Sequence, residues 1–470
     1  MVVGSLDIET DVLIIGAGPG GYTAAVRAAK QGKEVTVVDA NRDLGGVCLH
    51  YGCIPTKTLI HSTNFQHVIT DLEHCGVEMG DVDVNFEKIV ENKNEVIETL
   101  ARGVEHLFEK QGIEIIKGYA RFEDEQTVHL SGQSDVTSIT FQSCIICTGS
   151  TPIEVPGFPY EHERILSSRD LLDIDHIPES MIIIGGGYIG TEMGTVFGKL
   201  GTSVDIVEMT DQLIPALPSH VVDVVANKLS TFGVKTHLEC GAKSFTETEN
   251  GLRVSFEHKN GERKELEAEV ILVVAGRRPN TDDMGLENID ITVDEQGFIP
   301  VNARMETTTK NIYAIGDVNG QPLLAHKAMA QGKVVGDILA GQDVAYRNMV
   351  IPLVVFNDPE IACVGLTKSQ AEEEGYNVIT GRFQLMMSGR AHALNQAEGF
   401  IEVIADEETH RLLGVQSVGP RVSGMIGEAA LAIEMGATLE DVSATIHAHP
   451  TISEAFMEAC DVALGKGIHS

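Results

Sequence analysis

The stretch of sequence that decides the fold is Asp11-Val-Leu-Ile-Ile-Gly16-Ala-Gly18-Pro-Gly-Gly21. Its apolar, β-branched start predicts a buried parallel strand over residues 11–16. The chain that follows predicts an Ala-rich helix over 22–31 and a second strand over 34–39, which ends on Asp39. A glycine-rich turn between strand and helix, with an acid about 20 residues further on, predicts a βαβ unit that binds a dinucleotide.

Each glycine of this turn has a separate task in such a unit. Gly16 allows the tight turn, Gly18 lets the backbone approach the pyrophosphate, and Gly21 lets helix and strand pack closely. The helix N-terminus offers N–H donors and the positive end of its dipole to the phosphates. Asp39 is predicted to accept hydrogen bonds from the adenosine ribose hydroxyls.

The same pattern occurs a second time along the chain. An apolar run over 181–184 leads into Gly185, Gly187 and Gly190, and a second strand ends on Glu208. The first glycine and the acid are 23 positions apart in both copies, from 16 to 39 and from 185 to 208. A glycine-rich loop without a ligand is the alternative for either copy alone, but two copies in register predict a chain that binds two dinucleotides.

Glu208 also selects the second cofactor. A carboxylate at this position favours a free ribose 2′-hydroxyl and repels a 2′-phosphate, which would require an arginine. No Arg or Lys lies within residues 204–211. The second unit is therefore predicted to bind NAD and not NADP.

Two cysteines follow the first unit, in Leu44-Gly-Gly-Val-Cys48-Leu-His-Tyr-Gly-Cys53-Ile-Pro-Thr-Lys57. With glycines on both sides, Cys48 and Cys53 can reach disulfide geometry across one turn. Pro55 suits a helix start, so Cys53 is expected near a helix N-terminus, whose dipole stabilises a thiolate. A structural disulfide and half of a metal site are the alternatives; no second Cys/His pair is suitably placed, so no metal is predicted. The context predicts a redox pair.

The other six cysteines give no second redox site. Cys144 and Cys147 also form a CxxC, but they lie in an apolar strand, where burial is the better explanation. No role is predicted for the remaining four, which are Cys75, Cys240, Cys363 and Cys460. Cysteines scattered in this way do not indicate a secreted, disulfide-stabilised scaffold.

Length and charge narrow the class of protein. The chain of 470 residues contains 34 Lys+Arg and 69 Asp+Glu, a formal net charge of −35, and its length predicts two to four domains. A field of that sign repels nucleic acid and anionic membranes, so neither is an expected partner. Acids spread along the whole chain predict a halophilic acidic surface; an ordinary acidic cytosolic protein is the alternative. The N-terminus lacks signal-peptide features and no apolar run approaches bilayer length, which predicts a cytoplasmic location.

Five further motifs follow the redox segment along the chain. They are Thr148-Gly149, Ala275-Gly276-Arg277-Arg278-Pro279-Asn280, Asn311-Ile-Tyr-Ala-Ile-Gly316-Asp317, Ala325-His326-Lys327-Ala328 with Gln331-Gly332, and His449-Pro450-Thr451-Ile452-Ser453-Glu454. These motifs, and the redox segment with its likeness to GGTCxNxGCIPSK, resemble those of the pyridine nucleotide–disulfide oxidoreductases in family order. The Ala325 motif has the form seen in the dihydrolipoamide dehydrogenases of that family.

The resemblance implies an α/β fold with two Rossmann-like domains, which bind FAD and NAD, and a C-terminal α+β dimerisation domain. The implied division is an FAD-binding domain over 1–150, an NAD-binding domain over 151–277, a further FAD or central domain over 278–349, and the dimerisation domain over 350–470. Each active site would be completed by the C-terminal domain of a partner, so the implied working unit is a homodimer.

The resemblance also implies which residues meet the cofactors. Those implied for FAD are Lys57, Thr148, Gly149, Ala325 and Asp317, and Gly276 is implied for NAD. Asp317 would bind the ribityl chain. Lys57 and Glu192 correspond to a family ion pair near the flavin ring nitrogen, although two unrelated helix charges would explain them without the resemblance.

The implied reaction is oxidation of dihydrolipoamide to lipoamide with reduction of NAD⁺ to NADH. Cys48 would be the sulfur attacked by the substrate thiolate, and Cys53 the sulfur beside the flavin. Substrate thiols ionise well above neutral pH, so a base is needed; the resemblance selects His449, oriented by Glu454, over the chemically similar His447. The implied partner is a lipoyl-bearing protein of a 2-oxoacid dehydrogenase or glycine-cleavage complex.

Two departures keep an alternative substrate open. His50 stands where the family usually has Asn, and Tyr188 stands where dihydrolipoamide dehydrogenases often have a small aliphatic residue. The alternative is a paralogous reductase acting on another low-molecular-weight disulfide, as glutathione reductases do. Glu208 argues against it, because those enzymes normally carry basic residues there for NADPH.

Two further classes fit less well. A mercuric reductase would need a C-terminal cysteine pair, and only Cys460 is present. A flavin-binding protein without turnover would predict loss of Cys48, Cys53 or His449, and all three are intact.

Overall fold

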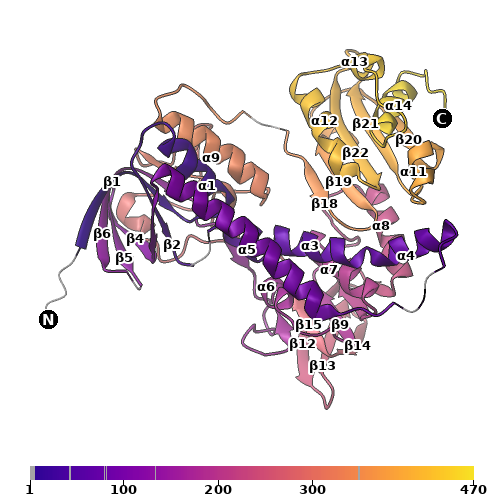
Figure 1. Cartoon of the computed structure of the whole chain (residues 1–470), viewed down its shortest axis with the longest axis horizontal. Coiled ribbons are helices and arrows are strands. Elements are labelled where there is room, and N and C mark those ends of the chain that lie inside the picture. The colour runs from indigo at the N-terminus through magenta and orange to yellow at the C-terminus, as the bar shows by residue number, and fades with distance from the viewer. Residues whose placement is uncertain are drawn as a thin grey trace. The chain divides into compact units, whose positions relative to one another are not determined.

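The computed structural model describes residues 6–41, 44–78, 80, 82–132, 134–347 and 350–469. The chain divides into two compact units, whose elements are labelled in Figure 1. Unit 1 comprises Met1–Thr58, Val90–Ile153 and Gly276–Arg347, and unit 2 comprises Leu59–Ile89, Glu154–Ala275 and Asn348–Ser470. The division into four domains at 150, 277 and 349 stays a prediction, and residue 349 lies outside the described residues.

Unit 1 contains a seven-stranded sheet with the strand order β3-β2-β1-β6-β5-β4, in which β17 also pairs with β6. β3, β2, β1, β6 and β17 run parallel, whereas β5 pairs antiparallel with both of its neighbours, β6 and β4. The strands are β1 Leu6–Ile15, β2 Val35–Asp39, β3 Glu114–Lys117, β4 Tyr119–Asp124, β5 Thr127–Ser131, β6 Val136–Ile146 and β17 Ile312–Ala314. A further antiparallel pair is formed by β7 Ser150–Pro152 and β16 Arg277–Pro279.

The helices of unit 1 cover this sheet. They are α1 Pro19–Ala29, α2 Gly46–His50 and α9 Ala325–Leu339, with the 3-10 helices η1 Leu286–Ile289 and η2 Gly316–Asn319. α3 Cys53–Thr63 and α5 Phe86–Gln111 contain residues of both units. α1 and α9 can approach closely because Gly332 has no side chain. A Cβ there would lie 2.5 Å from the carbonyl oxygen of Gly20. Arg27 and Asp337 join the same two helices by an ion pair of 2.6 Å.

The first predicted strand and helix are present with different bounds. β1 begins earlier than residue 11, at Leu6, and α1 begins at Pro19 and not at residue 22. The helix starts earlier because proline already has the φ angle of a first helical turn, and Gly18 precedes it in an extended conformation. The glycine-rich turn is thus shorter than predicted, which brings the helix N-terminus directly to it.

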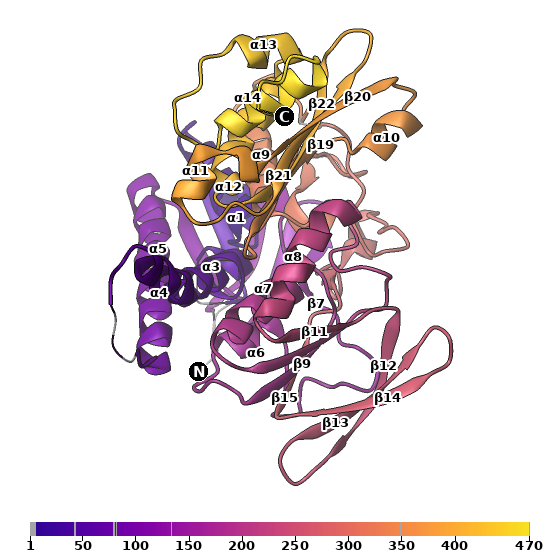
Figure 2. The same cartoon turned by 90° about the vertical axis from the view of Figure 1, so that its right-hand side faces the viewer.

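Unit 2 repeats the same arrangement in a five-stranded parallel sheet of order β11-β10-β9-β15-β8. Its strands are β8 Ile165–Leu166, β9 Ser180–Ile184, β10 Ser203–Val207, β11 Val234–His237 and β15 Val270–Val273, and its helices are α6 Ser168–Leu172, α7 Tyr188–Lys199 and α8 Ser219–Thr231. In both copies the glycine-rich turn leaves the carboxyl end of a central strand, β1 or β9, where open α/β sheets bind ligands. The antiparallel strands β12 Cys240–Glu247, β13 Leu252–His258 and β14 Arg263–Ala268 lie beside this sheet (Figure 2).

The last part of unit 2 is an antiparallel sheet of order β18-β19-β22-β21-β20. Its strands are β18 Leu353–Val355, β19 Glu360–Gly365, β20 Val378–Gln384, β21 Phe400–Asp406 and β22 Leu412–Gly419. The helices are α10 Lys368–Glu373, η3 Leu385–Met387, α11 Gly389–Ala393, α12 Val422–Glu434, α13 Leu439–Ala444 and α14 Glu454–Ala463, with α4 Phe65–His74 also in unit 2. α12 packs on β19 and β22, and α14 packs on β20 and β21, around a core that includes Val403 and Phe456.

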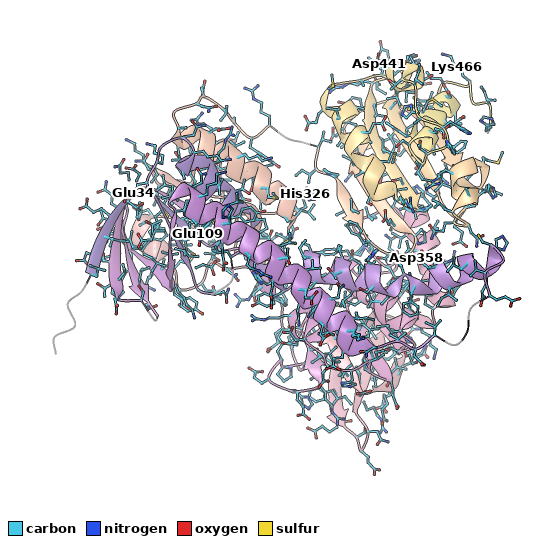
Figure 3. The ribbon with its side chains drawn as sticks, viewed as in Figure 1. Glu34, Glu109, His326, Asp358, Asp441 and Lys466 are labelled. Atoms are coloured by element: carbon cyan, nitrogen blue, oxygen red, sulfur yellow. The ribbon has the colours of Figure 1, made fainter. Side chains whose placement is uncertain are left out.

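Acidic side chains project from the ribbon into solvent. Glu34, Glu109 and Asp441 are exposed and are labelled in Figure 3. Within the described residues, no helix combines the length and the apolar character that crossing a bilayer requires.

Candidate nucleotide sites and redox pair

In the first glycine-rich turn, two glycines lie too close to other backbone atoms to carry a side chain, and a third faces open space. Gly16 has a φ of +108°, and a Cβ there would lie 2.4 Å from the carbonyl oxygen of Cys147. A Cβ on Gly21 would lie 2.0 Å from the carbonyl oxygen of Gly16. Beside Gly18 there is no atom within 4 Å of such a Cβ, so this position faces open space. The turn therefore fits a bound pyrophosphate at Gly18.

The second turn has the same geometry. Gly185 has a φ of +112°, with a Cβ position 2.6 Å from the carbonyl oxygen of Val274. The Cβ position of Gly190 is 2.0 Å from the carbonyl oxygen of Gly185, and that of Gly187 faces open space. The two glycine-rich turns thus share one geometry, with close contacts at the first and third glycines and open space at the second.

Asp39, the last residue of β2, and Glu208, the residue after β10, each form a hydrogen bond with a glycine-rich turn. Asp39 accepts a hydrogen bond from the Ala17 N–H at 2.7 Å, and Glu208 accepts one from the Gly186 N–H at 2.6 Å. These equivalent contacts were not predicted from the sequence, which assigned the acids only to ribose hydroxyls. A carboxylate has about four acceptor positions, so each acid retains capacity for a ribose hydroxyl.

Both acids also bond to the chain just after them. Asp39 accepts from the Asn41 N–H at 2.8 Å, and Glu208 accepts from the Thr210 N–H at the same distance. Glu208 is buried, with 9% of its surface exposed. The two carboxylates are therefore fixed in position before any dinucleotide arrives.

The residues that resemble flavin-contact motifs meet within unit 1. The Thr148 hydroxyl donates to the carbonyl oxygen of Asn280 at 2.6 Å, and the Asn280 amide donates to that of Thr148 at 2.9 Å. Asp317 lies in η2 and accepts from the Ser150 hydroxyl at 2.6 Å. Ser150 follows Thr148-Gly149 directly in the sequence, yet its contact with Asp317 was not predicted.

Two other residues of these motifs take defined places. Ala325 is the first residue of α9, and Gly276 has a φ of +130°, a conformation that favours glycine. Lys327, also near the start of α9, donates to the carbonyl oxygen of Gly320. Burial lowers the pKa of Lys327 to about 8, and the charge of Asp317 opposes that shift.

Cys48 and Cys53 form a hydrogen-bonded thiol pair. Cys48 lies in the short helix α2, and Cys53 is the first residue of α3, as the helix-start prediction expects. The hydrogen bond between the two thiols and the burial of Cys48 raise the pKa of Cys48, while the charge of Lys57 opposes that shift. At the N-terminus of α3, the helix dipole favours a thiolate on Cys53. Cys48 thus has a partner thiol within hydrogen-bonding distance, and Cys53 lies at a helix N-terminus that stabilises a thiolate.

The second CxxC is buried. Cys144 is fully buried and Cys147 is 8% exposed. The Cys147 thiol donates to the carbonyl oxygens of Ile15 and Gly16 at 3.2 and 2.9 Å, and burial raises its pKa well above the ordinary range of a thiol. Cys147 is therefore a packing residue behind the first turn.

Lys57 and Glu192, the two residues of the implied ion pair, belong to different units. Lys57 lies in unit 1, and Glu192 lies in α7 of unit 2. Glu192 is 1% exposed and accepts from the Phe356 N–H at 2.9 Å. One helix position before it, the Thr191 hydroxyl donates to the Asn357 side chain at 3.3 Å. The helix that begins at the second glycine turn is thus tied to the segment that leads into β19.

Lys199 adds a buried ion pair at the other end of α7. Its ammonium lies 2.6 Å from Asp358 and donates to Asn64 at 2.8 Å, and its side chain is 1% exposed. Burial lowers the pKa of Lys199, and Asp358 opposes this shift by favouring the charged form. Thr191, Glu192 and Lys199 together anchor α7 to residues 356–358.

Removing this buried cation is expected to cost more stability than removing a surface one. Lys199→Met should lower the free energy of unfolding by about 3 kcal/mol, because it removes the buried cation that pairs with the Asp358 carboxylate, whose side chain is only 16% exposed. Lys228→Met is the matched control: Lys228 lies 3.6 Å from the largely exposed Glu398, and its loss should cost less than about 1 kcal/mol. Urea denaturation measures both. Equal losses in the two variants would contradict the role given to the Lys199 pair.

His449 and His447 differ sharply in exposure, although their residue type is the same. The His449 side chain is 79% exposed, and its Nδ1 lies 2.8 Å from Glu454, the first residue of α14. The His447 side chain is 4% exposed and lies between Glu428 at 2.7 Å and the carbonyl oxygen of Thr445 at 2.8 Å. Among the described residues, Nε2 of His449 has no hydrogen-bond partner, whereas both nitrogens of His447 are engaged.

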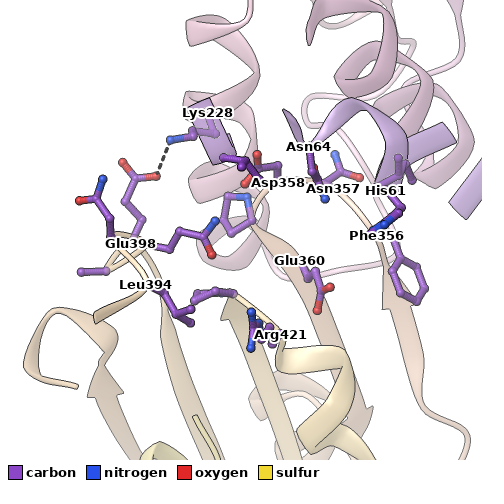
Figure 4. Close-up of a pocket in the computed structure, with 17 residues that line it drawn as sticks. His61, Asn64, Lys228, Phe356, Asn357, Asp358, Glu360, Leu394, Glu398 and Arg421 are labelled. Atoms are coloured by element: carbon purple, nitrogen blue, oxygen red, sulfur yellow. Dashed lines mark ion pairs between the residues drawn. The ribbon is translucent and has the colours of Figure 1, made fainter. Parts of the chain in front are cut away.

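A cavity of about 500 Å³ lies elsewhere in unit 2 (Figure 4). Residues from α3, α8, the start of β19 and the segment before it, residues 394–398 and the segment after β22 line it, among them His61, Lys228, Asn357, Glu360 and Arg421. Among the described residues that line it, none is a predicted site residue.

Comparison with known proteins identifies relatives over the full chain. Residues 10–332 match the family model described as pyridine nucleotide-disulphide oxidoreductase, and residues 351–460 match the dimerisation domain of that family. A dihydrolipoyl dehydrogenase of Haloferax volcanii is 45% identical, with 100% of this chain and 99% of the relative covered. A dihydrolipoyl dehydrogenase of Geobacillus stearothermophilus is 44% identical with the same coverage. An HOCl-induced flavoprotein disulfide reductase from Escherichia coli superimposes with a TM-score of 0.85 at 28% identity, covering 96% of this chain and 99% of that one.

These matches confirm several predictions made from the motifs. The resemblance to dihydrolipoamide dehydrogenases, the fold class, the oxidoreductase class and the cofactors FAD and NAD are confirmed. The match over 351–460 supports the predicted homodimer. The similarity to a Haloferax volcanii protein fits the predicted halophilic surface.

Proposed function

Because the chain belongs to the pyridine nucleotide-disulphide oxidoreductase family, we propose that it oxidises dihydrolipoamide to lipoamide and reduces NAD⁺ to NADH. The observation that carries the proposal is the thiol pair of Cys48 and Cys53 at the start of α3. The relatives named dihydrolipoyl dehydrogenase support the substrate. Unit 1 would hold FAD at Gly18 and Asp317, and unit 2 would hold NAD at Gly187 and Glu208.

The proposed chemistry on the protein is thiol–disulfide exchange. In the oxidised enzyme Cys48 and Cys53 share a disulfide, and a substrate thiolate attacks Cys48 and releases the Cys53 thiolate. The second substrate thiolate then attacks the substrate sulfur of the mixed disulfide, so that lipoamide leaves and Cys48 becomes a thiolate. Two electrons have then passed from the substrate to the cysteine pair. Bound FAD would supply the acceptor for these two electrons, so that the Cys48–Cys53 disulfide forms again, and would allow their transfer as a hydride to NAD⁺.

The substrate thiols need a base, and His449 is the proposed one. Glu454 accepts the Nδ1 proton of His449, so the free Nε2 can take a proton from a dithiol. Glu454 also accepts from the Thr451 N–H at 2.7 Å, which fixes the carboxylate against the loop that carries His449. The family resemblance implies that such a base serves the active site of a partner subunit, and the matched dimerisation domain supports a homodimer as the proposed working unit.

The proposed partner protein, location and salt dependence follow from the net charge of the chain and from its similarity to dihydrolipoyl dehydrogenases. A lipoyl-bearing protein of a 2-oxoacid dehydrogenase or glycine-cleavage complex is the proposed partner, and the cytoplasm the proposed location. The net charge of −35 supports activity that rises with salt, because salt screens the self-repulsion of an acidic surface.

A comparison of electron donors and acceptors tests the proposal. The flavin-loaded protein should reduce NAD⁺ with dihydrolipoamide at least about 100-fold more efficiently than NADP⁺, since Glu208 would face the extra phosphate with a like charge. The measurement is kcat/KM for each nucleotide, in low and high salt. NADPH-dependent reduction of glutathione disulfide, without oxidation of dihydrolipoamide, would replace the proposed substrate by that of the paralogous reductases.

A further inference from the structure

A chain of three side chains ends on Asp317 in unit 1. The Ser150 hydroxyl donates to Oδ2 of Asp317 at 2.6 Å, and the same hydroxyl oxygen accepts from Nε of Arg277 at 2.8 Å. A second guanidinium nitrogen of Arg277 donates to the carbonyl oxygen of Ser150 at 2.5 Å. Arg277 therefore holds Ser150 at two atoms, one on the side chain and one on the backbone.

The available protons determine which group donates in each of these hydrogen bonds. A hydroxyl has one proton, and the guanidinium of Arg277 can only donate. With Arg277 on its oxygen, the Ser150 proton turns toward Asp317. Ser150 is 3% exposed, so water has little access to replace either contact. The carboxylate of Asp317 is thereby fixed through one of its two oxygens.

The other oxygen of Asp317 is left for a ligand. Among the described residues, Oδ1 of Asp317 has no hydrogen-bond partner, while Oδ2 is taken by Ser150. Charge-assisted hydrogen bonds are stronger and more directional than neutral ones, so the Arg277 contact stiffens the arrangement. β7 and β16 pair antiparallel at this point, with Arg278 opposite Thr151.

We propose that Arg277, acting through Ser150, is a positioning residue for flavin binding, which presents Oδ1 of Asp317 to a ribityl hydroxyl. This inference rests on the proposed FAD site. Arg277 and Ser150 act by orienting Asp317 and have no proposed contact with the reacting atoms. The effect should therefore be seen in the affinity for FAD.

The neighbouring arginine supplies a matched control. Arg278 has the same side chain one position later, but it pairs with Asp282, and both of these side chains are more than half exposed. Arg277→Met should raise the dissociation constant of FAD about 10-fold, and Ser150→Ala by a similar factor, because each removes a hydrogen bond that orients a charged group. Arg278→Met should change it less than about 2-fold. Arg277→Lys should restore part of the loss, since one donor remains.

The dissociation constant is measured by titrating apoprotein with FAD and following flavin fluorescence, with thermal unfolding of each apoprotein as the check on folding. The double variant Arg277→Met/Ser150→Ala should bind FAD no more weakly than either single variant, because the two residues act as one chain. Independent, multiplying losses would overturn the inference, as would an unchanged affinity in Arg277→Met. A wild-type chain that binds no FAD would overturn the proposed function together with this inference, whereas normal wild-type binding with either of those two results would overturn the inference alone.

Discussion

Cys48→Ser is expected to keep bound FAD and to lose dihydrolipoamide oxidation by at least about 1000-fold in kcat. A serine hydroxyl cannot form the mixed disulfide, so the exchange step has no sulfur to attack. Cys48 lies in α2, after the glycine turn and not within it, so the turn that would hold the dinucleotide should be unaffected. Flavin absorbance gives cofactor content, and NADH formation from dihydrolipoamide gives activity.

Two further measurements make this result specific. Cys75→Ser is the matched control, because Cys75 is an exposed thiol outside every motif of the chain; it should retain full activity. NADH should still reduce the flavin of Cys48→Ser, since that transfer does not use the sulfur pair. Full turnover in Cys48→Ser would remove the disulfide from the mechanism.

The parts of the fold that follow from local sterics could be predicted from the sequence. The first glycine of each turn, at 16 and 185, requires a positive φ, and the third would clash with the first if it had a side chain. The clash of the third glycine acts between residues five positions apart, so the motif itself contains the information that this demand needs. The same holds for Cys53, whose place at a helix start follows from the proline two residues later.

Contacts between distant segments could not be predicted in this way. Ser150 and Asp317 are 167 positions apart, and Ser150 and Arg277 are 127 apart. Nothing near Ser150 in the sequence names its partners, because the contact depends on how β7, β16 and η2 meet. The buried pair of Lys199 and Asp358 is of the same kind. Sequence patterns assign residue types to elements, whereas tertiary packing decides which polar side chains meet.

The burial of a side chain, like its distant contacts, could not be predicted from residue type. His447 and His449 share one short loop, and chemistry alone does not separate them as bases. The structure separates them by exposure, with side chains 4% and 79% exposed. A base must reach a substrate thiol, so the exposed ring with one nitrogen held by a carboxylate has the required form.

His449→Gln is accordingly expected to lower kcat/KM for dihydrolipoamide by about 10²- to 10⁴-fold, the usual contribution of a general base. The loss should shrink as pH rises, because the substrate thiols then ionise without help from the protein. A pH series of kcat/KM measures this for the wild type and the variant. FAD content should stay the same, since none of the residues proposed to hold FAD lies in the His449 loop.

A histidine with the same kind of partner but no proposed role provides the matched control. His410 pairs with Glu440 at 2.6 Å, is 37% exposed, and also lies in the C-terminal part of unit 2. His410→Gln should leave kcat/KM within about 2-fold of the wild type, because an exposed pair of this kind contributes little even to stability. Glu454→Gln should fall between the two, since it keeps an acceptor for Nδ1 but loses the charge that stabilises the protonated ring. If the pH-dependent loss appeared in His447→Gln and not in His449→Gln, the proton would pass through the buried ring, and the exposure argument for His449 would be wrong.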